Sequence, residues 1–192
     1  GGWVVYDYED CKHVLESEHL YRHPYADLDE VGIEIKGGKR NITILQGEEH
    51  TLMHRYLSRL FMRQAIEDYM VGHVRPIMDY LFDRIARQGE AELCYEFASQ
   101  LPPRVFISLF GLDWKDEELV DRELQLHTWI MDWVGGKRDA EHVARARAAS
   151  KELNEMLLPI IRKRKEERGD DFISRLWNEA PGILDDITEL DV

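Results

Sequence analysis

The sequence has little cysteine: Cys11 and Cys94 are the only two among 192 residues. They form no disulfide framework and no metal-binding spacing, which excludes a disulfide-stabilised secreted scaffold and a cysteine-ligated zinc module. No apolar run approaches the roughly 20 residues that a membrane span needs. The start of the chain also lacks the basic region and apolar stretch of a secretory signal. We therefore expect a reduced, cytoplasmic protein without a membrane partner.

Positive charge is scarce as well. Lys and Arg number 25 against 38 Asp and Glu, which gives a formal net charge of −13 at pH 7. Because so acidic a chain repels phosphate, nucleic acid is not expected to be the main partner. Hydrophobic residues still make up 44% of the chain and charged residues 33%. This composition is typical of a folded globular protein and not of a disordered one.

Hydrophobic patterning predicts a mainly α-helical chain with three regions. Residues 3–17 read as a short strand, 3–6, followed by a helix that Asp7 caps. Residues 21–45 show no clean periodicity and predict a long loop, which in a compact domain is usually functional or disordered. From residue 48 to 192, apolar side chains recur every three or four positions, the pattern of amphipathic helices.

Proline, glycine and aspartate predict where these helices bend, begin and end. Pro76 lies inside a predicted helix and is expected to bend it, and Gly89 marks the end of that helix. Asp139 is expected to begin a long helix, and Asp170 to cap a short one. The sequence stops at Val192 without a terminating element, which predicts an incomplete domain of a longer protein.

The most informative stretch is GEEHTLMHRYLSRLF at residues 47–61. At about 100° per residue, His50 and His54 lie with neighbouring apolar positions within roughly 60° on one helix face. Arg55, Arg59 and Arg63 form a second stripe about 160° away. One face therefore presents imidazoles beside apolar groups, and the other is cationic.

Several kinds of site use two histidines one helical turn apart. A zinc site of the metalloprotease type requires Glu directly after the first histidine, but Thr51 stands there. A di-iron carboxylate bundle requires two Glu-x-x-His units, and only Glu16 to His19 has that spacing. Two readings remain open. The histidines are exposed and bind nothing, or they bind the carboxylates of a ligand whose body is apolar, such as haem.

The same stretch resembles a helix of bacterial cytochrome P450 enzymes that reads approximately G/P-x-E-H-x-x-x-R-R-x-x-x-x-x-F. The matching residues are Gly47, Glu49, His50, Thr51, Arg55 and Phe61. In that family the histidine and the basic residue four positions later bind the haem propionates, so the resemblance implies this role for His50 and His54. Because arginine is usual where His54 stands, Arg55 is a third candidate.

Three further segments resemble the family in the same order. GGWVVYDYEDCKHVLES is similar to its G-x-W-V-V-T-x-Y-E-D-V strand and helix, EFASQLPPRVFISLFGLDWKD to its D-F-A-x-x-L-P segment, and RGDDFISRLWN to its P-x-D-D-L-L-S segment. The resemblance implies the amino-terminal part of the P450 fold. The A-G-x-x-T motif, the E-x-x-R pair and the cysteine loop are missing. The axial cysteine is therefore not in this chain, since neither Cys11 nor Cys94 lies in such a loop.

The resemblance also implies a function for the parent protein. It would carry heme b and insert oxygen from O2 into a small apolar organic substrate, with electrons from a ferredoxin-type donor that docks on Arg55, Arg59 and Arg63. Residues 21–45 would contact the substrate, and helices around 119–134 and 140–168 would form a mobile lid. The fragment alone is expected to be inactive. Two other hypotheses stay open: a haem-free helical binding module, and one chain of a split enzyme.

Overall fold

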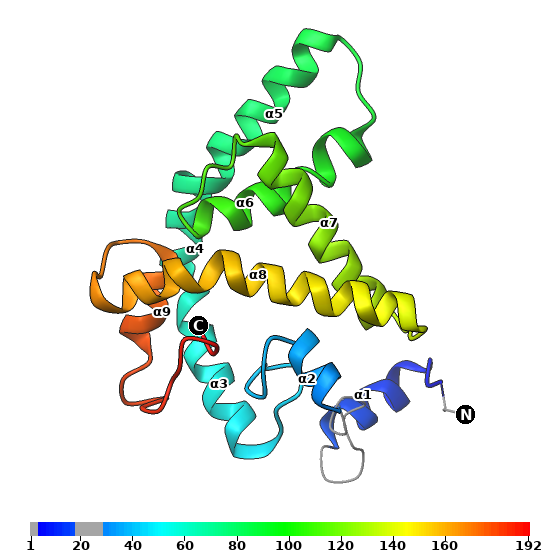
Figure 1. The fold of residues 1–192 in the computed structure, drawn as a ribbon, viewed down its shortest axis with the longest axis vertical. Helices are drawn as coiled ribbons and strands as arrows, with labels where there is room; N and C mark the ends of the chain where they lie inside the picture. Colours follow the sequence, from blue (N-terminus) through cyan, green and yellow to red (C-terminus); the bar gives the residue numbers. More distant parts are fainter. Residues whose placement is uncertain (1–3, 18–28) are drawn as a thin grey trace.

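The computed structural model describes residues 4–17 and 29–192, and helices dominate them (Figure 1). This confirms the mainly α-helical fold. None of the helices in these two ranges is both long and apolar enough to cross a membrane. The elements are α1 (Tyr8–Glu16), α2 (Glu30–Ile35), α3 (Gly47–Leu60), α4 (Arg63–Tyr69), the π-helical turn η1 (Met70–Val74), α5 (Arg75–Gln88), the π-helical turn η2 (Cys94–Ala98), α6 (Leu101–Leu109), α7 (Glu117–Val134), α8 (Ala140–Glu166) and α9 (Phe172–Glu179).

The strand predicted at residues 3–6 is wrong for residues 4–6, the part of it that the structure describes. These residues have no strand structure, and the side chains of Val4 and Tyr6 are 82% and 91% exposed. A strand needs a neighbouring strand to satisfy its N–H and C=O groups, and residues 4–17 and 29–192 contain none. The helix that follows begins as predicted, because the Asp7 carboxylate accepts a hydrogen bond from the Glu9 N–H at 3.1 Å.

The loop predicted at residues 21–45 contains a helix, α2; its first residues, 21–28, lie outside the described ranges. The Asp29 carboxylate caps α2 by accepting a hydrogen bond from the Gly32 N–H at 2.8 Å. Ile35 at the end of α2 is only 2% exposed and packs against Trp133 and Ala146 of α7 and α8. Burial in this cluster stabilises a helix that local propensity alone does not predict.

Helix ends otherwise follow the side chains that favour them. The carboxylates of Asp116 and Asp139 cap α7 and α8, and Gly89 ends α5 with a φ of 82°. The cap of α9 is Asp171 and not Asp170 as predicted. Asp171 has the extended backbone of a cap residue and accepts a hydrogen bond from the Ser174 N–H at 2.9 Å.

Pro76, where a bend is predicted, closely follows a π-helical turn. Segments α4, η1 and α5 follow one another without a break from Arg63 to Gln88, and Pro76 stands in the first turn of α5. A proline has no N–H to donate, and its ring crowds the carbonyl four residues earlier. The turn before Pro76 therefore departs from α geometry, as π-helical turns inside α-helices do.

Helix α8 crosses the molecule and separates two groups of helices (Figure 1). Segments α5, α6 and α7 lie on one side of it, and α1, α2 and α3 on the other. Helix α9 (orange-red) returns from the end of α8 and packs against α3. The largest buried cluster joins these two helices through Met53, Tyr56 and Leu60 of α3 and Leu176 and Ala180 of α9.

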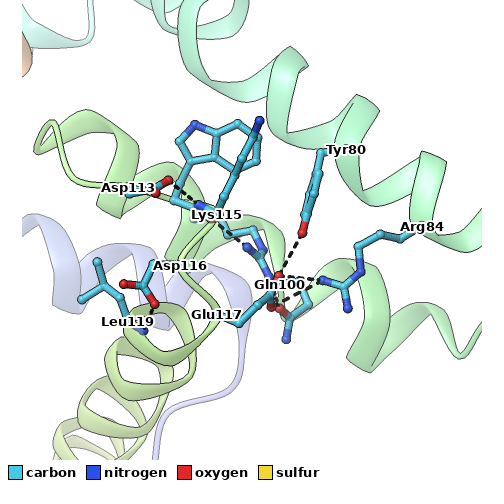
Figure 2. A network of polar contacts seen from close by, with 10 residues as sticks. Tyr80, Arg84, Gln100, Asp113, Lys115, Asp116, Glu117 and Leu119 are labelled. Carbon is cyan, nitrogen blue, oxygen red and sulfur yellow. Dashed lines mark hydrogen bonds and ion pairs between the residues drawn. The ribbon is translucent and has the colours of Figure 1, made fainter.

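A network of polar contacts around Glu117 joins α5, α6 and α7; Figure 2 shows Tyr80 and Arg84 pointing toward this carboxylate. The Arg104 side chain on α6 is 0% exposed. Its Nη1 donates to the Trp114 carbonyl at 2.7 Å, and its Nη2 donates to Glu117 Oε2 at 2.6 Å. The Glu117 carboxylate also accepts hydrogen bonds from Tyr80 Oη at 2.9 Å and from Arg84 Nη1 at 3.2 Å. Glu117 therefore ties the first turn of α7 to both α5 and α6.

These contacts shift the titration of Glu117. Burial acts to raise the pKa of its carboxyl, but the hydrogen bonds from Arg104 and Tyr80 and the charges of Arg104 and Arg84 outweigh this, so the pKa lies below the ordinary value of 4.5. A lowered folded-state pKa means that the contribution to stability is fully present above pH 4.5. It is lost as the pH falls through the lowered pKa.

We predict that Glu117→Gln destabilises the protein by about 2 kcal/mol. That is less than the 3–5 kcal/mol for breaking a fully buried pair, because the Glu117 side chain is half exposed. Denaturant unfolding at pH 7 measures the difference. Glu118→Gln is the matched control, because it removes the same charge from the first turn of α7. Equal losses in the two variants would contradict the role given to the Arg104 pair.

Candidate functional site

Helix α3 carries the predicted site, and its amino-terminal end is formed by local contacts. Gly47 has a φ of 61°, a left-handed conformation that favours glycine. Glu48 and Glu49 lie in the first turn, where the helix dipole favours negative charge. The Thr51 hydroxyl donates a hydrogen bond to the Gly47 carbonyl at 3.0 Å. The helix is therefore well formed before it reaches His54.

The structure brings the two predicted histidines together. The ring centroids of His50 and His54 lie 5.9 Å apart with an interplanar angle of 33°. His50 is half-buried and His54 exposed. His54 Nδ1 lies 3.4 Å from the Ser58 hydroxyl, so Nε2 is the nitrogen that a bound acceptor would use. Two neighbouring imidazoles can each donate one hydrogen bond while neutral.

The histidines lie beside the buried stripe of α3, not within it. The fully buried positions are Met53, Tyr56 and Leu60, whose centre lies about 100° around the helix from the histidines. The arginine stripe lies about 100° away in the other direction. The contact of α3 with the rest of the protein thus separates the imidazole face from the cationic face.

The arginine stripe is exposed, and two of its members already have partners. Arg59 Nη1 lies 3.2 Å from a carboxylate oxygen of Glu179 on α9. Arg63 Nε lies 3.0 Å from Glu67, one turn further along. No ion pair joins Arg55 to another residue in the described part of the chain. Arg55 is therefore the member of the stripe most available to an external anion.

A hollow of about 300 Å³ adjoins α3; neither histidine lines it, and its lining mixes apolar side chains with charged ones such as Glu189 and Asp191. Met53 and Leu57 of α3 line it, together with Leu157 of α8. Arg40 lies at its edge and pairs with Asp186 at 3.1 Å. Leu57 lies within about 60° of both histidines on the helix surface, so imidazole and apolar side chains are neighbours there, the combination that an apolar ligand with carboxylates requires.

One hydrogen bond that the sequence did not reveal sets the contact between α3 and α9. Tyr56 Oη donates to the Leu176 carbonyl at 3.0 Å, and the Tyr56 side chain is 0% exposed. Burial and the negative charges of Asp191 and Glu179 raise the pKa of the Tyr56 phenol. The phenol therefore stays a neutral donor at physiological pH. Its helical position marks Tyr56 as buried, but no sequence signal identifies the carbonyl that it meets.

The predicted substrate loop lies against the predicted lid. Glu34 of α2 pairs with Arg147 of α8 at 2.7 Å, and its backbone carbonyl accepts a hydrogen bond from the Ser150 hydroxyl at 2.8 Å. Helices α7 and α8 are joined in turn by Arg122, whose Nε donates to Glu152 at 2.7 Å. Segment 29–35 is thus attached to the α7–α8 pair.

Residues that could bind a metal do not gather elsewhere in the described ranges. No group of three or more His, Cys, Asp or Glu side chains there could hold a metal ion. Cys94 is exposed, and Cys11 is half-buried with its Sγ 3.4 Å from the Val5 carbonyl. Within the described ranges, the candidate site therefore consists of the histidine pair and its apolar neighbours.

Comparison with known proteins gives relatives along nearly the whole chain, although no protein-family profile matches it. The chain is 30% identical over 189 residues to cytochrome P450-SU2 of Streptomyces griseolus, an alignment that covers 96% of this chain and 44% of the relative. It is 27% identical over 177 residues to the mycinamicin IV hydroxylase/epoxidase of Micromonospora griseorubida, with 91% of this chain and 42% of the relative covered.

A third relative is the C-19 steroid 1alpha-hydroxylase of Sorangium cellulosum, which is 26% identical over 135 residues, 70% of this chain and 34% of the relative. The chain therefore spans less than half the length of these curated relatives. The helical fold and these alignments agree, and the chain is a homologue of the cytochrome P450 proteins of bacteria.

Proposed function

We propose that this chain is part of a haem-thiolate monooxygenase that inserts oxygen from O2 into a small apolar molecule, and that His50 and His54 bind the haem propionates. The observation that carries the proposal is the pairing of the two imidazoles, 5.9 Å apart, on one side of α3. Two relatives support the reaction class, since their names describe a steroid hydroxylase and a hydroxylase/epoxidase.

The residues on this side of α3 fit the chemistry of heme b. Haem combines a flat apolar ring with two carboxylates, and here imidazole donors adjoin an apolar surface that includes Leu57. A charge-assisted hydrogen bond to a carboxylate is about twice as strong as a neutral one. Arg55 is the third candidate donor; it lies about 100° around the helix from His54. When bound through a cysteine thiolate, haem supplies O2 activation, and that cysteine is neither Cys11 nor Cys94.

Substrate contact is proposed for residues 21–45 and the α7–α8 pair. Because α2 is attached to α8 through Glu34, Arg147 and Ser150, movement of α8 would carry residues 29–35 with it. These elements would exclude water from the substrate and admit it by opening. We place the protein in the cytoplasm, where a soluble electron donor reaches it.

The electron donor is proposed to be an acidic protein of the ferredoxin type that docks on Arg55, Arg59 and Arg63. The stripe is exposed; Arg59 and Arg63 have glutamate partners, so Arg55 offers the positive charge that no ion pair within the described ranges neutralises. Complementary charge accelerates the encounter of two proteins more than it strengthens their complex.

We predict that His54→Gln weakens haem binding by about tenfold or more, since a hydrogen bond to a charged group contributes about 1.5–3 kcal/mol. The His50→Gln/His54→Gln double variant should lose more. Haem retention of the complete gene product, measured as absorbance remaining after gel filtration, tests this. His142→Gln is the control, because His142 pairs with Asp139 on α8. Unchanged retention in the double variant would exclude the propionate role.

We predict that Arg55→Glu slows reduction of the protein by an acidic ferredoxin several-fold at low salt, with haem content unchanged. The effect should exceed that of Arg63→Glu, because Arg63 is already paired with Glu67. The difference should shrink as ionic strength rises and screens the charges. Stopped-flow reduction measures the rates, with Arg145→Glu on α8 as the control. Equal rates for Arg55→Glu and the unaltered protein at every ionic strength would contradict the docking role.

A further inference from the structure

The direction of the histidine pair depends on how α3 is rotated about its own axis. The buried stripe of α3 lies between the histidine face and the arginine face, about 100° from each. Any rotation of α3 in its contact with α9 therefore turns both faces together. A rotation of one residue position, about 100°, would bring the histidines to the place of the buried stripe.

Apolar packing alone leaves that rotation weakly defined. Met53 and Leu60 of α3 pack on Leu176, Ala180 and Leu184. The hydrophobic effect that holds them together is non-directional and grows with the area buried. Small rotations that keep the area constant are therefore opposed only by the shape of the packed side chains.

Two directional contacts join α3 to α9 and lie on different parts of the helix surface. Tyr56 Oη donates to the Leu176 carbonyl at 3.0 Å within the buried contact. Arg59 Nη1 meets Glu179 at 3.2 Å on the exposed side towards the arginine stripe. Hydrogen bonds weaken steeply when their angles depart from alignment. Two such contacts define the rotation that one apolar stripe does not.

Helix α9 is fixed by contacts to α8, so the rotation of α3 can be set against it. Trp177 Nε1 donates to the Ile161 carbonyl of α8 at 3.1 Å, and Trp177 is 5% exposed. The Asp171 cap fixes the start of α9, and the buried Ser174 hydroxyl accepts a hydrogen bond from the Gly169 N–H at 2.8 Å. The carbonyl that Tyr56 meets is therefore fixed by contacts to α8.

We infer that Tyr56 is a positioning residue for the haem propionates: its hydrogen bond to α9 sets the rotation of α3 and thereby aims His50 and His54. This inference rests on the proposed function, since it concerns the same histidines. Arg59 has the same effect from the exposed side. Neither Tyr56 nor Arg59 touches the ligand in this account.

The test compares haem with its dimethyl ester, whose esterified propionates carry no negative charge. The complete gene product is loaded with either compound, and its loss to an excess of a competing haem-binding apoprotein is timed. Tyr56→Phe keeps the ring and removes only the hydroxyl. Tyr80→Phe is the matched control, because it removes a hydroxyl from the hydrogen bond to Glu117 at the far end of the molecule. Thermal midpoints are recorded for both variants.

We expect Tyr56→Phe to speed the loss of haem by about three- to tenfold, the range set by one hydrogen bond, and to leave loss of the dimethyl ester unchanged. Tyr80→Phe should alter neither rate, even if its thermal midpoint falls as far. Equal acceleration for haem and its ester, or none for either, would show that Tyr56 is merely structural and overturn the inference.

Two further variants keep the test decisive. Arg59→Gln acts on the second contact and replaces Tyr56→Phe if that variant fails to fold; it should also speed loss of haem and not of the ester. His54→Gln tests directly whether the histidines bind the propionates. If His54→Gln leaves haem loss unchanged, the propionate role fails. If His54→Gln speeds the loss of haem and Tyr56→Phe does not, the propionate role of the histidines stands and only the positioning role of Tyr56 is overturned.

Discussion

The contact of α3 with α9 is the interaction on which the rest of the site depends. One buried stripe, centred on Tyr56, separates an imidazole face from a cationic face. The same contact completes the largest buried cluster and is fixed to α8 through Trp177. A change in this contact would therefore alter the candidate cofactor site and the candidate docking face together.

Helix α8 connects the α3–α9 contact to the other regions. Its carboxyl-terminal half supports α9, whereas its amino-terminal half carries α2 through Arg147 and Ser150 and pairs with α7 through Glu152. Beyond α7, Glu117 in the first turn of that helix is tied to α6 by the buried Arg104 and to α5 by Tyr80. The proposed substrate-contacting elements thus share one support, α8, with the helix that holds the histidines.

Much of this could be predicted from the sequence, because it follows from local rules. Cap residues such as Asp7 and Asp139 predict helix starts, and the spacing of His50 and His54 alone predicts that the two imidazoles meet. Local rules could not predict the features that depend on tertiary contacts. The strand at residues 3–6 was wrong because residues 4–6 have no neighbouring strand in the described ranges. Helix α2 was missed because Ile35 is stabilised by Trp133, far along the chain. The carbonyl that receives the Tyr56 hydrogen bond is 120 residues away.

Whether His50 and His54 hold the carboxylates of a haem is tested best by an experimental structure of the complete gene product with haem bound. We predict that a ring nitrogen of each histidine lies within hydrogen-bonding distance of a propionate oxygen, about 2.7–3.2 Å. We also expect Tyr56 to remain hydrogen-bonded to the Leu176 carbonyl and the axial cysteine to be neither Cys11 nor Cys94. Propionates directed away from α3, with both histidines facing only water, would contradict the propionate role of the histidines.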